Sequence, residues 1–279
     1  MLFPMLLAQA AALTPPDPPV IPIRPSKIIL VGDSTTQVNS GWGGSLCATR
    51  VVSTAACLNL ARGGRSTKSY RAEGSWAMAL AEAKVPGYAA TYILIQFGHN
   101  DQPGKPGRST DLTTEFPANL RRYVTEARAA GARPVLLTPL TRRSFTAGQL
   151  TRDLDPWAGA VRRVATDLRV PLVDLTVRSA AVMQVLSPAM AAHYAQLPPE
   201  ARVMAAALTG TTIDKGPMST AAPASPPASA SPADPPPVGV VKASFDYTHL
   251  NRDGADLFAG IVATELAGEV PAMRPLLVP

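Results

Sequence analysis

Residues 27–35 read Lys-Ile-Ile-Leu-Val-Gly-Asp-Ser-Thr, and this stretch decides the fold. Its apolar residues are consecutive, are partly β-branched and stop at a glycine, which is typical of a strand buried on both faces. The same pattern returns at 92–97, 134–138 and 170–175, and more weakly at 55–60. The sequence therefore predicts a buried sheet of about five strands.

Helical patterns lie between these strands. Apolar residues recur at steps of three and four in 112–127, ahead of Gly131, and again in 157–168. Strands that alternate with helices predict βαβ units and a parallel sheet with right-handed crossovers. The predicted fold class is α/β, a three-layer αβα sandwich around a central parallel sheet.

The chain is expected to form one domain with appended segments. Residues 1–13 are apolar and contain Ala-Gln-Ala, which resembles a signal-peptidase site, so a signal peptide and a secreted or periplasmic location are expected. Residues 14–26 are a Pro-rich linker, and 27–270 are the domain. Within it, 208–243 are rich in Pro, Ala and Ser and predict a flexible surface insertion, while 271–279 are a C-terminal tail.

Composition narrows the classes of function. The 279 residues carry a net charge of +6, but the sequence lacks the basic stripe with interleaved aromatics that nucleic-acid binding requires. Arginine pairs such as 142–143 are interpreted as solvated surface charge. Beyond the leader, no apolar stretch is long enough for stable membrane insertion, and a monomer is expected. Cys47 and Cys57 either pair in an oxidising compartment or stay as two buried thiols.

Polar residues follow three of the predicted strands, at the sheet edge where ligands bind in open parallel sheets. Ser34 lies directly after the first strand, and a serine hydroxyl needs a base to become a nucleophile. His249 is the candidate base, because Asp246, three residues earlier, can fold back onto its Nδ1–H. The predicted catalytic residues are Ser34, Asp246 and His249.

Donors for a developing oxyanion are also present. The predicted oxyanion hole consists of the Ser34 and Gly64 backbone N–H groups and the Asn100 amide. Three further side chains are candidates for substrate binding, each against a structural alternative. Arg65 binds a uronate carboxylate or forms a surface ion pair, His99 touches substrate or orients its loop, and Trp42 stacks on a sugar or packs in the core.

The four blocks resemble the SGNH (GDSL-like) hydrolases. Gly32-Asp33-Ser34, Gly64, Gly98-His99-Asn100-Asp101 and Asp246-Tyr247-Thr248-His249 stand in the family's order. The resemblance covers roughly residues 27–268 and implies an SGNH or flavodoxin-like fold. The detailed sequence of these motifs, including Asn59-x-Ala-x-Gly-Gly-Arg-Ser, resembles rhamnogalacturonan acetylesterases and related carbohydrate acetylesterases.

The resemblance implies a serine esterase that removes O-acetyl groups from a plant cell-wall polysaccharide, rhamnogalacturonan, pectin or xylan, through an acetyl-serine intermediate. The implied partner is an acetylated polysaccharide or oligosaccharide, and neither a metal nor an organic cofactor is expected. Two alternatives stay open. One is an SGNH lipase or thioesterase acting on lipid or acyl-CoA esters, and the other is a non-catalytic glycan-binding module.

Overall fold

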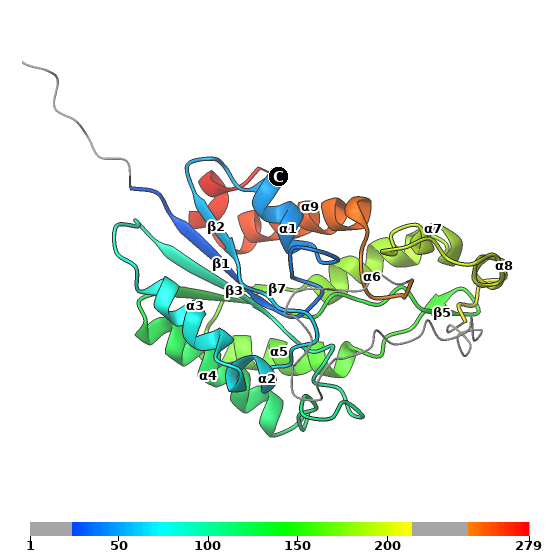
Figure 1. Cartoon of the computed structure of the whole chain (residues 1–279), viewed down its shortest axis with the longest axis horizontal. Coiled ribbons are helices and arrows are strands. Elements are labelled where there is room, and N and C mark those ends of the chain that lie inside the picture. Colours follow the sequence, from blue (N-terminus) through cyan, green and yellow to red (C-terminus); the bar gives the residue numbers. More distant parts are fainter. Residues whose placement is uncertain (1–23, 214–244, 279) are drawn as a thin grey trace, which may run out of the picture.

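The computed structural model describes residues 24–213 and 245–278 (Figure 1). The expected signal peptide, most of the Pro-rich linker and most of the predicted insertion lie outside the described residues. The insertion is described up to residue 213, and there Thr212 donates its N–H to the carbonyl oxygen of Phe145.

The centre of the molecule is a parallel sheet of five strands in the order β2-β1-β3-β4-β7, which confirms the predicted fold class. This is the strand order of flavodoxin-like folds. The strands are β1 (Lys27–Gly32), β2 (Ala56–Asn59), β3 (Thr91–Gln96), β4 (Arg133–Leu137) and β7 (Leu172–Val173).

Helices cover both faces of the sheet, so the molecule has three layers (Figure 1). One face carries α2 (Ser69–Ala72), α3 (Ser75–Ala83), α4 (Glu115–Ala129) and α5 (Asp155–Leu168). The other face carries α1 (Gly43–Ser45), the π-helix η1 (Leu46–Arg50), α6 (Leu175–Val185) and α9 (Arg252–Glu269). Beyond the sheet lie the hairpin β5 (Phe145–Thr146) and β6 (Gln149–Leu150), and the short helices α7 (Pro188–Ala192) and α8 (Ala201–Leu208).

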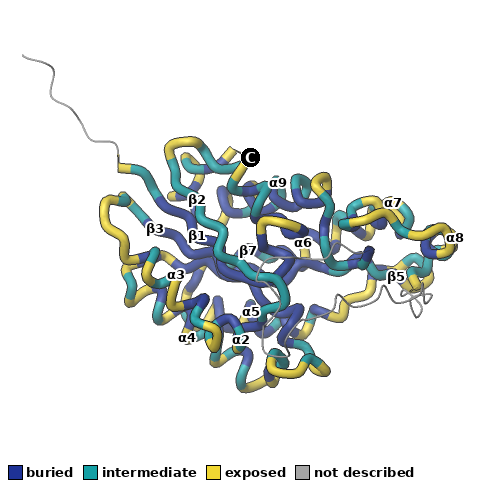
Figure 2. Tube along the Cα trace, in the orientation of Figure 1, coloured by how far each residue is buried: buried dark blue, intermediate teal, exposed yellow. Residues whose placement is uncertain are grey.

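The sheet separates the two large clusters of the core, and Figure 2 shows its strands as buried. Along β1, Ile28 and Leu30 face the cluster beneath α9, while Ile29 and Val31 face the cluster beneath α4. Successive side chains of a strand point to opposite faces, so a strand covered on both sides must be apolar throughout. This explains why β1 has the uninterrupted run that identified it.

The C-terminal residues are packed rather than free. Residues 271–276, within the expected tail, form the 3-10 helix η2 (Pro271–Leu276), and Leu277 makes an antiparallel bridge with Val51. Cys47 of η1 and Cys57 of β2 form a disulfide, which decides between the two states left open by the sequence. Within the described residues, no helix is both long and apolar enough to cross a membrane.

Candidate active site

The site lies at the carboxyl end of β1, where the strand order reverses. From β1 the chain moves outward to β2 and then returns to β3 on the other side of β1. The loops after β1 and β3 therefore diverge at this point and leave a crevice, which is where open α/β sheets bind ligands. Ser34 follows β1 at this point, and Asn100 follows β3.

Ser34 is held on a tight turn by its neighbour Asp33. The Asp33 carboxylate accepts hydrogen bonds from the backbone N–H (2.9 Å) and hydroxyl (2.8 Å) of Thr35, and the Asp33 carbonyl oxygen accepts the N–H of Gln37 at 3.1 Å. Gln96 at the end of β3 accepts the hydroxyl of Thr36 at 2.5 Å. The turn is thus fastened both to itself and to the neighbouring strand, with the Ser34 side chain at its start.

His249 and Asp246 form a close pair on the loop before α9. The Asp246 Oδ2 lies 2.6 Å from the His249 Nδ1, and its Oδ1 accepts the backbone N–H groups of Thr248 (2.8 Å) and His249 (2.7 Å). Burial alone would raise the pKa of Asp246, but these hydrogen bonds and the imidazole outweigh it and lower the pKa to about 2. The carboxylate therefore stays charged and able to orient the ring over the working range of an enzyme.

Arg143 holds this loop from beneath. Its guanidinium donates to the backbone carbonyl oxygens of Asp246 (3.1 Å), Thr248 (3.2 Å) and His249 (2.7 Å), and its own N–H donates to the carbonyl oxygen of Tyr247 at 2.8 Å. Its side chain is only 1% exposed. The interpretation of this arginine as surface charge is therefore wrong, because its charge is buried against the carbonyls of the Asp246–His249 loop.

The loop of His249 contacts the turn of Ser34. The N–H of Leu250 donates to the carbonyl oxygen of Ser40 at 2.9 Å, which ties the two segments together. Among the described residues, the Ser34 hydroxyl has no hydrogen-bond partner, and its residue is 8% exposed. The two loops are therefore joined by a backbone hydrogen bond, and no described hydrogen bond joins the Ser34 hydroxyl to the His249 imidazole, a bond that is often long in enzymes without substrate.

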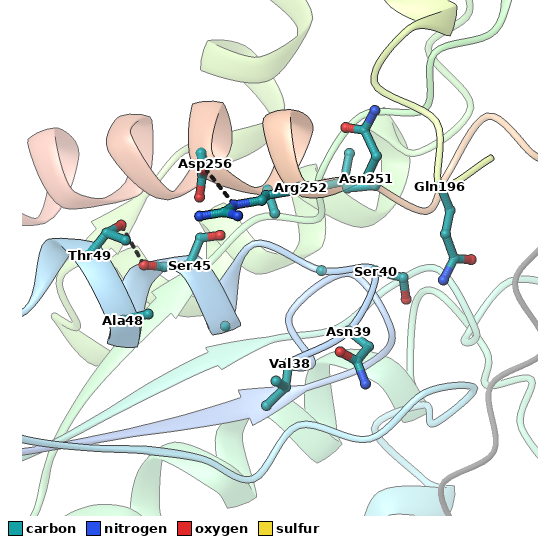
Figure 3. A pocket seen from close by; sticks show the side chains of 14 residues that line it. Val38, Asn39, Ser40, Ser45, Ala48, Thr49, Gln196, Asn251, Arg252 and Asp256 are labelled. Carbon is teal, nitrogen blue, oxygen red and sulfur yellow. Dashed lines mark hydrogen bonds and ion pairs between the residues drawn. The ribbon is translucent and has the colours of Figure 1, made fainter. Parts of the chain in front are cut away.

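A cavity of about 710 Å³ opens beside both loops. Its lining side chains come from the Ser34 loop, from α1 and η1, and from the start of α9 (Figure 3). Asn39, Gln196 and Asn251 line the end of the cavity where the loops meet, and Arg252 pairs with Asp256 further along. The lining mixes amide and hydroxyl groups with apolar surface, and none of the predicted catalytic or oxyanion residues is part of it.

Gly64 and Asn100, two of the three predicted oxyanion residues, lie on loops that are bound to each other. Gly64 has a φ of 77°, a conformation that favours glycine, and the Asn100 Nδ2 donates to the carbonyl oxygen of Arg65 at 3.1 Å. The Asp101 carboxyl accepts the hydroxyl of Thr67 at 2.5 Å and that of Thr110 at 3.1 Å. Gly64 and Asn100 are thereby held at one rim.

Two buried carboxyl groups stand behind this rim. Burial raises the pKa of Asp101 to about 7, although hydrogen bonds from Thr67 and Thr110 oppose the rise. Burial also opposes ionisation of Asp33, yet the imidazole of His99, with Nδ1 at 3.6 Å, and the bonds from Thr35 hold the pKa of Asp33 below its usual range. Asp33 therefore carries a negative charge next to the nucleophile turn, whereas Asp101 is partly protonated near neutrality.

For two of the three candidate substrate contacts, the structure favours the structural alternative. Trp42 is fully buried, and its Nε1 donates to Gln96 at 3.0 Å, so it packs in the core and offers no face to a sugar. The His99 side chain is 3% exposed beside Asp33 and is closed to substrate. The Arg65 guanidinium donates to Glu73 at 2.8 Å and to the carbonyl oxygen of Gly63 at 2.7 Å, and its role in binding stays a prediction.

Sequence reasoning missed three cationic residues at the site. Arg143 lies about a hundred residues before the loop that it binds, and no local pattern marks it. Lys105 and Arg108 lie in the loop after Asn100, between prolines and glycines that indicate only a turn-rich segment. Their proximity to the Gly-His-Asn-Asp block was the one available signal.

Known proteins resemble both the sequence and the fold. The model of the GDSL-like Lipase/Acylhydrolase family matches residues 30–257. Rhamnogalacturonan acetylesterase RhgT of Bacillus subtilis (strain 168) is 35% identical over 176 residues, which are 59% of this chain and 71% of that protein. The probable rhamnogalacturonan acetylesterase YesY of the same strain is 32% identical over 160 residues, which are 55% of this chain and 72% of that protein.

Two solved structures share the fold. The YxiM protein of Bacillus subtilis superposes with a TM-score of 0.58 at 23% identity, over 88% of this chain and 57% of that chain. A putative GDSL-like lipase from Parabacteroides merdae ATCC 43184 gives a TM-score of 0.56 at 16% identity, over 88% of this chain and 98% of that chain. The chain therefore belongs to the GDSL-like lipase/acylhydrolase family, in its rhamnogalacturonan acetylesterase-like branch, and is a carboxylic ester hydrolase.

Proposed function

We propose that the protein is a serine esterase that hydrolyses O-acetyl esters of a plant cell-wall polysaccharide, rhamnogalacturonan or a related pectin or xylan. The observation that carries the choice of substrate is the 35% identity to a rhamnogalacturonan acetylesterase across 71% of that protein. The 32% identity to a second protein, a probable rhamnogalacturonan acetylesterase, supports the same choice.

The proposed reaction uses the groups at the carboxyl end of β1. The His249 Nε2 takes the proton of the Ser34 hydroxyl, and the Ser34 oxygen attacks the acetyl carbonyl carbon. Asp246, 2.6 Å from the other ring nitrogen, fixes the tautomer and stabilises the imidazolium. The carbonyl oxygen becomes an oxyanion that accepts hydrogen bonds from the Ser34 and Gly64 N–H groups and from the Asn100 amide.

The tetrahedral intermediate then collapses to acetyl-serine, which is hydrolysed in a second half-reaction. The bond between the acetyl carbon and the sugar oxygen breaks, and the sugar leaves as an alcohol with the proton from His249. A water molecule, deprotonated by His249, attacks the acetyl-serine, and acetate leaves as the Ser34 oxygen regains the proton. Each half-reaction thus returns the imidazole to its starting state.

Acetate release from acetylated rhamnogalacturonan and acetylated xylan tests this function. We expect release by the wild type, none by Ser34→Ala, and full release by Ser53→Ala, which removes an exposed serine hydroxyl from a turn outside the site. A fluorophosphonate probe should label the wild type and Ser53→Ala but not Ser34→Ala. Preference for p-nitrophenyl esters of eight or more carbons over the acetate ester would instead support a lipase, and absence of both labelling and turnover would support a glycan-binding module.

We also propose that the protein acts outside the cytoplasm. The Cys47–Cys57 disulfide supports this location, because disulfides persist in oxidising compartments. Expression in a bacterial host with fractionation tests it. The active, oxidised protein should appear in the periplasm or medium, and retention in the cytoplasm with a full-length N-terminus would contradict the proposal.

A further inference from the structure

Two cationic side chains converge on the oxyanion residue Asn100. The Lys105 Nζ donates to the carbonyl oxygen of His99 at 2.8 Å and lies 3.5 Å from the Asn100 Oδ1. The Arg108 Nη1 donates to the carbonyl oxygen of Gly64 at 3.3 Å and lies 3.5 Å from the same Oδ1. Both side chains are half-buried, so they border the site without being sealed from solvent.

Neither cation has an acidic partner among the described residues, and this separates them from their neighbours. Around the same loops, Arg62 and Arg65 pair with Glu73, and Arg142 pairs with Asp153. Lys105 and Arg108 form no such ion pair with any residue in 24–213 or 245–278. Within the described part of the chain, their charges face carbonyl oxygens and more distant carboxyl groups.

The local balance of charge is positive. Burial lowers the pKa of Lys105, and the nearby charges of Arg142 and Arg108 lower it further, while Asp33 and Asp101 act in the opposite direction. Both of these carboxyl groups are buried, and both already accept hydrogen bonds from threonines. An anion that entered beside Lys105 and Arg108 would therefore relieve repulsion that the described residues leave in place.

The two cations also border the predicted oxyanion groups, Lys105 at Asn100 and Arg108 at Gly64. A Cβ atom built on Gly64 would be 3.4 Å from the Arg108 Nη1, so the guanidinium lies directly over the oxyanion glycine. With an acetyl oxygen in the oxyanion hole, the attached sugar ring is confined to the neighbourhood of this loop. A uronic acid carries a carboxylate on that ring, and guanidinium and ammonium groups bind carboxylates with charge-assisted hydrogen bonds.

We propose that Lys105 and Arg108 form a subsite that binds the carboxylate of a uronic acid in the acetylated substrate. The subsite rests on the proposed acetylesterase function and selects acidic pectic chains over neutral ones. The net charge of +6 acts in the same direction, because it attracts a polyanionic chain at long range.

The test compares acetylated rhamnogalacturonan oligosaccharides with the same oligosaccharides after their carboxyl groups have been reduced to alcohols. For the wild type, we expect kcat/KM to be higher on the acidic set by about tenfold or more, the effect of one to two charge-assisted hydrogen bonds. In the Lys105→Gln/Arg108→Gln double variant this ratio should fall to near one, mostly through a higher KM on the acidic set. Added salt should reduce the wild-type ratio and leave the double variant little changed.

The matched control is Lys84→Gln, which removes one exposed positive charge at the end of α3, at the opposite edge of the sheet. Its ratio should equal that of the wild type. Active-site titration with a fluorophosphonate corrects each rate for the folded fraction, so a variant that folds poorly still yields a ratio.

Three outcomes would overturn the subsite. The first is a ratio near one in the wild type, and the second is an unchanged ratio in the double variant. The third is a kcat of the double variant that is lowered equally on both substrate sets. The last result would mean that the two cations stabilise the oxyanion and do not bind the uronic acid carboxylate. Absence of acetate release from either set by the wild type would overturn the proposed function itself, and the subsite with it.

Discussion

The Arg143 guanidinium donates to the carbonyl oxygen of His249 at 2.7 Å, from a position 106 residues earlier in the chain. The same group also donates to the carbonyl oxygens of Asp246 and Thr248. A buried cation thus fixes the backbone on both sides of the proposed catalytic pair. It touches no position that a substrate reaches, so its effect on the reaction is exerted through the geometry of His249.

Replacement of Arg143 should therefore reduce turnover more than substrate binding. We expect Arg143→Met to lower kcat by about a hundredfold, the typical cost of displacing a catalytic group by about 1 Å, with little change in KM. Arg143→Lys restores a donor and should recover part of the loss. A merely structural role would lower the melting temperature and leave the kcat of the folded fraction intact. The surface variant Arg178→Met, which removes an ion pair with Glu265, is the control for loss of a positive charge.

Asp246 is expected to act on the imidazole and not on the loop alone. In Asp246→Asn the side-chain oxygen still accepts the N–H groups of Thr248 and His249, but the amide faces Nδ1 and favours the wrong tautomer. We expect kcat on p-nitrophenyl acetate to fall by about 10⁴-fold with the fold retained. Asp111→Asn is the matched control, because Asp111 accepts the same kind of backbone bonds, from Thr113 and Thr114, without an imidazole. Equal losses in the two variants would contradict the orienting role.

The sequence was informative where structure depends on neighbours in the chain. The pair Asp246 and His249 is three residues apart and contacts within one turn of backbone, so its spacing alone predicted the contact. The strand β1 was predicted because burial on both faces requires an uninterrupted apolar run. The predicted strand at 170–175 shrinks to Leu172–Val173, because Pro171 has no N–H to offer to the sheet and Asp174 is already the N-cap of α6.

The sequence was uninformative where a residue's environment is built by distant segments. Trp42 follows the nucleophile turn in the chain, yet its indole lies beneath the sheet against Gln96. In the sequence, Arg143 resembles solvated surface charge next to another arginine. In the fold, its side chain is buried against the loop before α9. Exposure and ion pairing depend on the whole fold, so the burial of Trp42 and Arg143 could not be predicted from local sequence.

Asp101 should make stability depend on pH near neutrality. Its pKa in the folded protein is about 7, above the ordinary value of 3.8, so the folded state binds this proton more tightly than the unfolded state. The sign follows from linkage: its contribution to stability is fully present below about pH 4 and is lost as the pH rises to about 7. The melting temperature of the wild type minus that of Asp101→Asn should therefore decrease as the pH is raised from about 4.5 to about 7.5, a range that spans most of this window.

Asp111 provides a control of opposite sign for this experiment. Hydrogen bonds from Thr113 and Thr114 lower the pKa of this carboxyl to about 2, so its contribution is present above about pH 4 and is lost only as the pH falls further. The difference in melting temperature between the wild type and Asp111→Asn should stay constant over the same range. If the difference in melting temperature between the wild type and Asp101→Asn is also independent of pH, Asp101 is ionised throughout this range.

Gly32 sets how closely the nucleophile turn approaches β3. A Cβ atom at this position would lie 2.7 Å from the carbonyl oxygen of Gln96 and 2.7 Å from the hydroxyl oxygen of Thr36, closer than real Cβ contacts permit. Gly32→Ala must therefore push the turn away from the strand and move Ser34 with it. We expect a loss of stability of about 1–3 kcal/mol, as for other overpacked sites, together with a fall in fluorophosphonate labelling rate. Gly268→Ala in α9 meets no atom within 4 Å and should leave labelling unchanged while stabilising the helix by about 0.5–1 kcal/mol. Wild-type labelling and melting in Gly32→Ala would mean that the spacing between the turn and β3 does not position Ser34.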